Sequence, residues 1–220
     1  DGINRLSQGS LPLFFSTIRK FIRDVAGVKI SRGHLRKVCA KVGDSLGTAY
    51  EQLLHLLPDE DWVNVDETGH KDSGKRMWTW CFRASLYTLF KIDTSRGSQV
   101  LVEVLGNEFS GVLGCDYFSA YRKYMSDFNV LIQFCLAHLI RDVKFLVNHP
   151  NMKNRRYGTR VLKSLRDMFD VIHRRETMTP AGFGRRLKET GQDLIWQATR
   201  YVPSMREAKN LARRFENHGE

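Results

Sequence analysis

Apolar residues recur at helical spacing near both ends of the chain and follow a strand-like pattern in the middle. Within residues 11–56, an apolar face predicts a first helix that ends at Gly27 and is built around Ile18, Phe21, Ile22 and Val25. Ser31 is placed to cap the N-terminus of a second helix. A helix, a glycine-containing turn and a capped helix are typical of a helix-turn-helix, and equally of two helices that only pack together.

Short runs rich in aromatic and β-branched residues predict five strands between residues 61 and 135. Ala84-Ser85 separates the second run from the third and predicts a hairpin there. Short helices are expected at SRGSQVLVEVLG, which also has strand composition, and at YFSAYRKYM, and a longer one at LAHLIRDVKFLVNH, running to Pro150. The five strand segments, in chain order, are DWVNVD, KRMWTWCFRA, LYTLFKI, GVLGCD and NVLIQFC.

From residue 151 onward the apolar spacing is helical throughout, with interruptions at Thr179-Pro180 and Val202-Pro203. The pattern therefore predicts an α/β region between two helical regions. We place these regions at 1–57 (helical), 58–150 (α/β) and 151–220 (helical).

The composition is that of a globular protein. Hydrophobic residues make up 42% of the 220, enough for a substantial core, and no run of about 18 uncharged apolar residues predicts a membrane span. The N-terminal residues lack the pattern of a signal peptide, and the absence of an initial Met indicates an internal fragment. Four cysteines without paired spacing indicate reduced thiols in a cytosolic protein: Cys39, Cys81, Cys115 and Cys135.

Positive charge is concentrated in the last third of the chain. Residues 1–150 hold 19 Lys and Arg against 16 Asp and Glu, a net charge of +3, whereas residues 151–220 hold 16 against 8, a net charge of +8. A basic segment of this kind suits nucleic acid, because neutralised phosphates release their condensed counterions. A solvated helical surface would show the same charge and is equally consistent with it.

Two carboxylates follow strands in a way that suggests chemistry. We expect Asp66 at the end of the first strand and Asp116 at the end of the fourth. If these two strands are parallel neighbours, both side chains meet at one edge of the sheet, where ligands of α/β proteins gather. Two adjacent carboxylates repel unless a cation joins them, and hard oxygen ligands suit Mg²⁺ or Mn²⁺. Taken singly, each Asp is more commonly a turn residue or a helix cap.

Four segments, in this order, resemble the catalytic core of bacterial transposases of the insertion-sequence-sixty-six family: VNVDETGHKDSGKRMWTWCFRAS, SRGSQVLVEVLG, GVLGCDYFSAY and CLAHLIRDVKFL. The resemblance extends from about Gly27 to the end of the chain and is densest from 62 to 145. It implies an α/β fold with an RNase H-like mixed sheet of five strands flanked by helices. It also implies an Asp-Asp-Glu metal site that binds Mg²⁺ or Mn²⁺, with 58–150 as the catalytic core and 151–220 as a basic helical insertion.

Position by position, the resemblance makes Asp66 and Asp116 the first two catalytic and metal-binding acids. Cys135 and His138 match a Cys-x-x-His signature that follows the fifth strand, and Arg141 lies one turn beyond. Two ligands do not make a zinc site, so we expect Cys135 to pack at the strand end and His138 to face the metal or a DNA phosphate, with Arg141 on its helical face. Glu67 points away from Asp66 if the strand continues, so its role is at most to support the metal ligands.

The family's third acid, a Glu, has no defensible match. Three glutamates lie near the end of the chain, but none has the Asn-rich context that precedes the family's Glu: Glu207, Glu216 and Glu220. We therefore expect the chain to stop short of the third acid and to be inactive alone.

The function that the resemblance implies is DNA transposition, in which metal-dependent hydrolysis at the ends of a mobile element precedes strand transfer. The expected partners are DNA and further copies of the chain on DNA, with no membrane, in the bacterial cytoplasm at the nucleoid. Two alternatives stay open. A stand-alone RNase H-like nuclease would need its remaining acids within the chain, for example Glu176 or Glu207, whereas a catalytically inactive DNA-binding remnant would need none.

Overall fold

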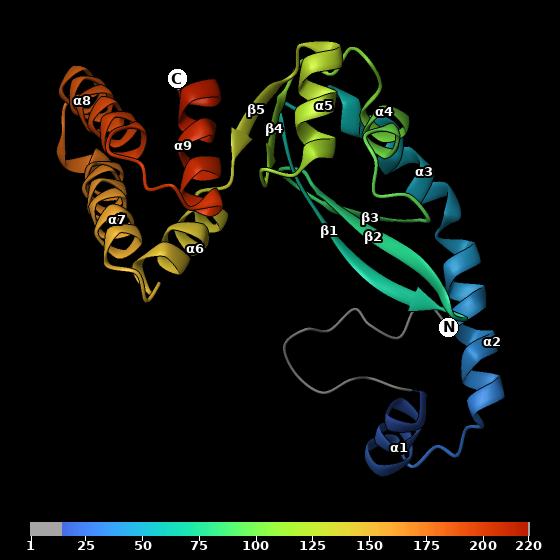
Figure 1. Ribbon diagram of the computed structural model, residues 1–220. Coiled ribbons are helices and arrows are strands. Elements are labelled where there is room, and N and C mark those ends of the chain that lie inside the picture. Colours follow the sequence, from blue (N-terminus) through green and yellow to red (C-terminus); the bar gives the residue numbers. More distant parts are fainter. Residues whose placement is uncertain (1–14, 220) are drawn as a thin grey trace. The chain divides into compact units, whose positions relative to one another are not determined.

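The computed structural model describes residues 15–219 and separates the chain after Phe134 into two compact units. The first unit contains the sheet, and the second, beginning at Cys135, is helical (Figure 1). Among residues 15–219, no helix combines the length and apolarity needed to cross a bilayer. The three-region division at residues 57 and 150 stays a prediction.

Three helices precede the sheet: α1 (Phe15–Ala26), α2 (Arg32–Ser45) and α3 (Gly47–Leu56). Gly27 follows α1 with a φ of 69°, a left-handed conformation that glycine adopts without steric cost, and Ser31 caps α2 by accepting a hydrogen bond from the His34 backbone N–H at 3.1 Å. Both predicted helix boundaries are therefore confirmed. Residues 11–14 of the predicted helical segment lie outside the described residues, and a helix-turn-helix role for α1 and α2 stays a prediction.

The sheet has five strands: β1 (Trp62–Asp72), β2 (Lys75–Arg83), β3 (Thr88–Asp93), β4 (Val112–Cys115) and β5 (Leu131–Phe134). Their order across the sheet is β3-β2-β1-β4-β5, with antiparallel β3-β2-β1 and parallel β1-β4-β5 pairings. Helices α4 (Gln99–Leu105) and α5 (Ser119–Phe128) connect β3 to β4 and β4 to β5. This mixed sheet flanked by helices has the predicted RNase H-like arrangement.

Strand β1 is longer than predicted. It continues from Asp66 to Asp72 and pairs with β2 along this whole length, whereas its pairing with β4 covers only residues 62–64. The expectation that Asp66 ends the strand was therefore wrong. The extension turns back through Ser73 and Gly74, whose φ values of 49° and 81° suit a two-residue hairpin loop, and Figure 1 shows it reaching beyond the short parallel strands.

One face of the sheet packs against α4 and α5 to form the core of the first unit. Alternate residues of β1, beginning with Val63 and Val65, point into it, as the period-two geometry of a strand requires. Trp80 is fully buried among them, and Trp78 is partly buried against the same cluster. The other buried members include Phe82, Leu89, Val100, Leu101, Val104, Leu105, Leu113, Cys115, Tyr121 and Tyr124.

The second unit is a helical bundle of α6 (Leu136–Val147), α7 (Met152–His173), α8 (Pro180–Thr199) and α9 (Arg206–His218). Pro180 occupies the first position of α8 behind the capping residue Thr179, and Pro203 lies in the connection to α9, so both predicted interruptions are confirmed. A separate core joins these helices and includes Val143, Leu146, Tyr157, Val161, Leu165, Leu194, Ala198 and Leu211.

Gly158 allows α6 and α7 to pack closely. A Cβ at this position would meet the backbone N of Val147 at 2.7 Å and Leu146 Cβ at 2.8 Å. We expect Gly158→Ala to lower the free energy of unfolding by about 2 kcal/mol, since the clash involves backbone that cannot rotate away. Urea unfolding measures the change.

Gly191→Ala is the matched control for this prediction. Gly191 lies in α8 with nothing within 4 Å of an added Cβ, so alanine there should stabilise by up to about 1 kcal/mol. Equal effects of the two substitutions would contradict the assigned packing.

Candidate functional site

The two predicted catalytic acids follow the paired part of the parallel strands β1 and β4. Val63 pairs with Leu113 and Asn64 with Gly114, the last pair between these strands, and Asp66 and Asp116 each lie two residues beyond it. Neighbouring strands lie about 4.8 Å apart, and side chains at paired positions point to the same face. Asp66 is exposed and Asp116 half-buried, on the face opposite the core.

Local hydrogen bonds hold one oxygen of each carboxylate. Asp66 Oδ1 accepts from the Glu67 backbone N–H at 2.9 Å, and Asp116 Oδ1 accepts from the Phe118 backbone N–H at 2.8 Å at the entrance to α5. Among the described residues, the second oxygen of each carboxylate has no hydrogen-bond partner. Carboxylate oxygens without a partner are ligands that suit a hard divalent cation.

A third ligand does not join this pair within the described part of the chain. No group of three His, Cys, Asp or Glu side chains there is arranged to hold a metal ion. Glu207 and Glu216 belong to α9 of the second unit, and Glu220 lies outside the described residues. That the chain stops short of the third acid stays a prediction.

Glu67 points into the core, away from Asp66. Its side chain is only 1% exposed, yet it carries a carboxylate, and two partners compensate it. Arg96, in the connection from β3 to α4, approaches Glu67 Oε1 with its Nη2 at 2.6 Å and its Nε at 2.7 Å, and the hydroxyl of Tyr121 on α5 donates to Glu67 Oε2. We call these three residues the Glu67 network.

Aromatic rings complete the surroundings of this network. The guanidinium of Arg96 lies 3.8 Å from the ring centroid of Phe118 and 4.6 Å from that of Trp78, distances at which cation–π attraction operates. Burial, and then the hydrogen bond to Glu67, raise the pKa of Tyr121 far above its ordinary value. The hydroxyl therefore stays a donor, and it ties α5, which directly follows Asp116, to the strand that carries Asp66.

Cys81 lies beside Asp66 on the face of the sheet opposite the core, and the charge of Asp66 affects the pKa of its thiol. The two residues are paired across β1 and β2, and burial followed by the negative charge of Asp66 raises the pKa of the Cys81 thiol. The thiol therefore stays protonated at neutral pH.

The Cys-x-x-His residues belong to the second unit. Cys135 is a half-buried free thiol at the N-cap of α6, and His138 is half-buried with an Nδ1 that lacks a partner among residues 15–219. Arg141 is exposed on the same helix. Their predicted contacts with DNA or with the metal ligands stay predictions.

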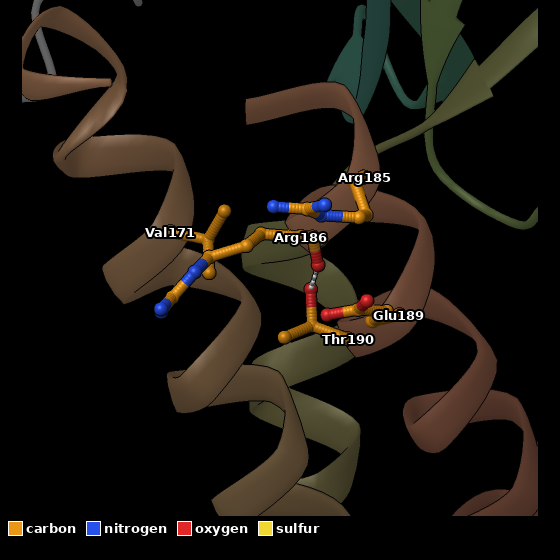
Figure 2. A pocket seen from close by; sticks show the side chains of 5 residues that line it. All are labelled: Val171, Arg185, Arg186, Glu189 and Thr190. Atoms are coloured by element: carbon orange, nitrogen blue, oxygen red, sulfur yellow. Dashed lines mark hydrogen bonds between the residues drawn. The ribbon is translucent and has the colours of Figure 1, made fainter. Parts of the chain in front are cut away.

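Basic side chains gather in the second unit where α7 turns into α8. Figure 2 shows Arg185 and Arg186 extending over a pocket of about 360 Å³, with Glu189 and Thr190 beneath them and Val171 of α7 opposite. A neighbouring pocket of about 270 Å³ shares both arginines and adds Arg174. Cations crowded around shallow pockets with one acid among them favour contact with phosphate oxygens.

Comparisons with known proteins give one clear match. A family described as "Transposase IS66 family" matches residues 11–217. No curated protein matches the chain.

The similar solved structures are weak matches. A chain of the simian T-cell lymphotropic virus intasome in complex with PP2A regulatory subunit B56 gamma is 12% identical, with a TM-score of 0.28, and the match covers 47% of this chain and 48% of that one. The chain thus spans about half the length of that protein. The HTLV-2 integrase catalytic core domain in complex with magnesium is 14% identical in its trimeric form, with a TM-score of 0.27, covering 58% of this chain and 93% of that one.

Glu67→Gln tests the buried network. The amide keeps the shape but removes the charge that compensates Arg96, so the free energy of unfolding should fall by about 2 kcal/mol. This lies below the roughly 3–5 kcal/mol of a fully buried pair because the Arg96 side chain is 37% exposed.

Glu103→Gln is the control for the same chemical change. It breaks the ion pair with Lys91, in which Glu103 is 61% exposed, and should cost less than about 0.5 kcal/mol in urea unfolding. A smaller loss for Glu67→Gln than for Glu103→Gln would refute the network's role.

Proposed function

The chain belongs to the IS66 family of transposases, and we propose that it supplies the two-aspartate part of a metal-dependent transposition site. In this proposal, phosphodiester bonds at the ends of a mobile element are hydrolysed, and the freed 3′-hydroxyl then attacks target DNA. The reaction class is polynucleotidyl transfer. Asp66 and Asp116 are the catalytic acids.

The observation that carries this proposal is the register between β1 and β4. Asp66 and Asp116 each lie two residues beyond its last pair, and one oxygen of each carboxylate has no hydrogen bond within the described residues, which supports their sharing a cation. Bound Mg²⁺ or Mn²⁺ would supply activation of the attacking oxygen and stabilisation of the leaving oxygen.

The protein's own part is to hold these carboxylates in place. The backbone N–H groups of Glu67 and Phe118 orient them, and the Glu67 network connects the strand of Asp66 to the helix after Asp116. The third acid of the site would come from a position that this chain does not provide among its described residues.

The helical second unit would bind the DNA backbone. The basic clusters around Arg174, Arg185 and Arg186 support this role, since contacts to phosphates position DNA without reading its sequence. We further propose that the chain acts as a homo-oligomer on paired DNA ends, in the bacterial cytoplasm at the nucleoid.

A second candidate is a DNA-binding protein without catalysis. The lack of a third ligand beside Asp66 and Asp116 in the described part of the chain favours it. Such a protein would bind DNA with a steep salt dependence, yet it would cleave nothing.

Calorimetric titration with Mn²⁺ tests the two-carboxylate site directly. We expect the 220-residue chain to bind Mn²⁺ and Asp66→Asn to weaken that binding at least about tenfold, because a neutral amide is a poor ligand for a hard cation. Asp72→Asn, at the far end of the same strand, is the matched control and should bind like the unmodified chain. Equal binding by the Asp66→Asn variant would contradict the assignment.

Strand transfer tests the catalytic role in a longer protein that contains this chain together with a third acid. Asp66→Asn and Asp116→Asn should each abolish transfer while leaving DNA binding largely intact, because neither carboxylate belongs to the basic surface. Transfer assays and filter binding measure the two properties. Retained transfer by both variants would exclude the proposed site.

A further inference from the structure

A third pocket of the second unit combines basic and aromatic side chains. It measures about 470 Å³ and lies between the first turns of α7 and the connection from α8 to α9. Helix α7 contributes Lys153, Arg156, Tyr157 and Arg160, and the connection contributes Tyr201, Val202, Pro203 and Ser204. No acidic residue lines it.

Tyr201 is held in a conformation that its own packing does not explain. Its φ is 48°, in the left-handed region that residues other than glycine seldom adopt, and 87% of the residue is exposed. A bulky exposed residue in such a conformation costs energy without burying apolar surface. Strain of this kind persists where the surrounding structure fixes it, and it clusters at ligand-binding sites.

Arg160 is the residue that fixes the backbone at Tyr201. Its guanidinium donates to the carbonyl of Gln197 at 3.1 and 3.3 Å and also to the carbonyl of Arg200, directly before Tyr201. The same guanidinium lies 5.6 Å from the ring centroid of Tyr157 and 5.9 Å from that of Tyr201. Tyr157 is itself buried and donates to the Ala198 carbonyl at 2.6 Å. Hydrogen bonds from Arg160 and Tyr157 therefore hold the backbone that directly precedes the exposed Tyr201 ring.

Two further cationic side chains of the pocket have no interaction partner within the described residues. Within the described residues, no hydrogen bond or ion pair joins the side chain of Lys153 or Arg156 to another residue, and both are exposed. Helix α9 begins beside Ser204 with no side chain capping its first N–H groups. The pocket thus presents one free aromatic face together with several donors for an anion.

We propose that this pocket binds an unpaired nucleotide of DNA, with its base stacked on Tyr201 and its phosphates contacted by Lys153 and Arg156. An unpaired base exposes the flat face that a ring needs, whereas a base inside a duplex does not. The proposal rests on the proposed function only in taking DNA as the ligand. It adds a site that distinguishes distorted or single-stranded DNA from a perfect duplex.

The test compares two duplexes of equal length at the same salt concentration, one perfect and one with a single unpaired 2-aminopurine. Fluorescence anisotropy gives both affinities, and 2-aminopurine emission reports stacking. We expect the 220-residue chain to bind the second duplex about tenfold more tightly, with quenched emission. Tyr201→Phe keeps the ring and should keep both effects.

Tyr201→Gly is the decisive variant. Glycine adopts the observed φ without steric cost, so the fold is retained while the ring is lost. The preference and the quenching should both disappear, with binding to the perfect duplex unchanged. Arg186→Gln, outside this pocket, should weaken binding to both duplexes by the same factor.

Three results would overturn the inference: no preference in the unmodified chain, an unchanged preference in Tyr201→Gly, or equal losses on both duplexes in that variant. Failure of the proposed function looks different. It would appear as no binding to either duplex, or as Mn²⁺ binding that is unchanged in the Asp66→Asn variant.

Discussion

Successive side chains of a β-strand point to opposite faces of the sheet, and the candidate site depends on this alternation along β1. Val63, Val65 and Glu67 enter the core, while Asp66 points to the other face. Two adjacent acids therefore have opposite surroundings. A shift of one residue in register would bury Asp66 and expose Glu67, so the apolar residues before them fix where each carboxylate lies.

The Glu67 carboxylate, which this alternation directs into the core, determines how the residues around it are arranged. An ionised carboxylate at 1% exposure is tolerated only with close partners, and Arg96 and Tyr121 provide them from two other elements. Both partners also contact the aromatic core, Arg96 through Phe118 and Trp78, and Tyr121 through Trp80 at a ring-centroid distance of 6.1 Å. Compensating one buried charge thus links the β3–α4 connection and α5 to β1, near the proposed metal ligands Asp66 and Asp116.

Local signals predicted most of the fold correctly. Gly27, Ser31 and Pro180 mark helix boundaries by their own backbone chemistry, so the sequence alone was sufficient there. The extension of β1 was missed because Thr68–Asp72 is polar and lacks strand composition; its strand is imposed by pairing with β2. The neighbouring Ser73-Gly74 is a hairpin signal that could have revealed it.

Long-range contacts account for what local patterns could not predict. Arg96 pairs with Glu67, and this contact joins residues far apart in the chain. The pocket at Tyr201 likewise depends on Arg160, whose partners lie on another helix. The parallel pairing of β1 with β4 was predicted from the order of elements and is confirmed, whereas the placement of Asp66 beside Asp116 stays a prediction.

The two-stranded extension of β1 and β2 also bears on dynamics. Beyond Gly69, β1 lacks a β4 neighbour and β2 lacks a β3 neighbour, and the remaining ribbon of two strands with polar side chains has little cooperative support. Its backbone amides should exchange with solvent by local opening, whereas those at Val63 and Val65 exchange only when the whole unit unfolds. The pair Gly69–Trp78, the last to have a third strand beside it, separates the ribbon from Asp66, so local opening of the ribbon should leave this carboxylate in place.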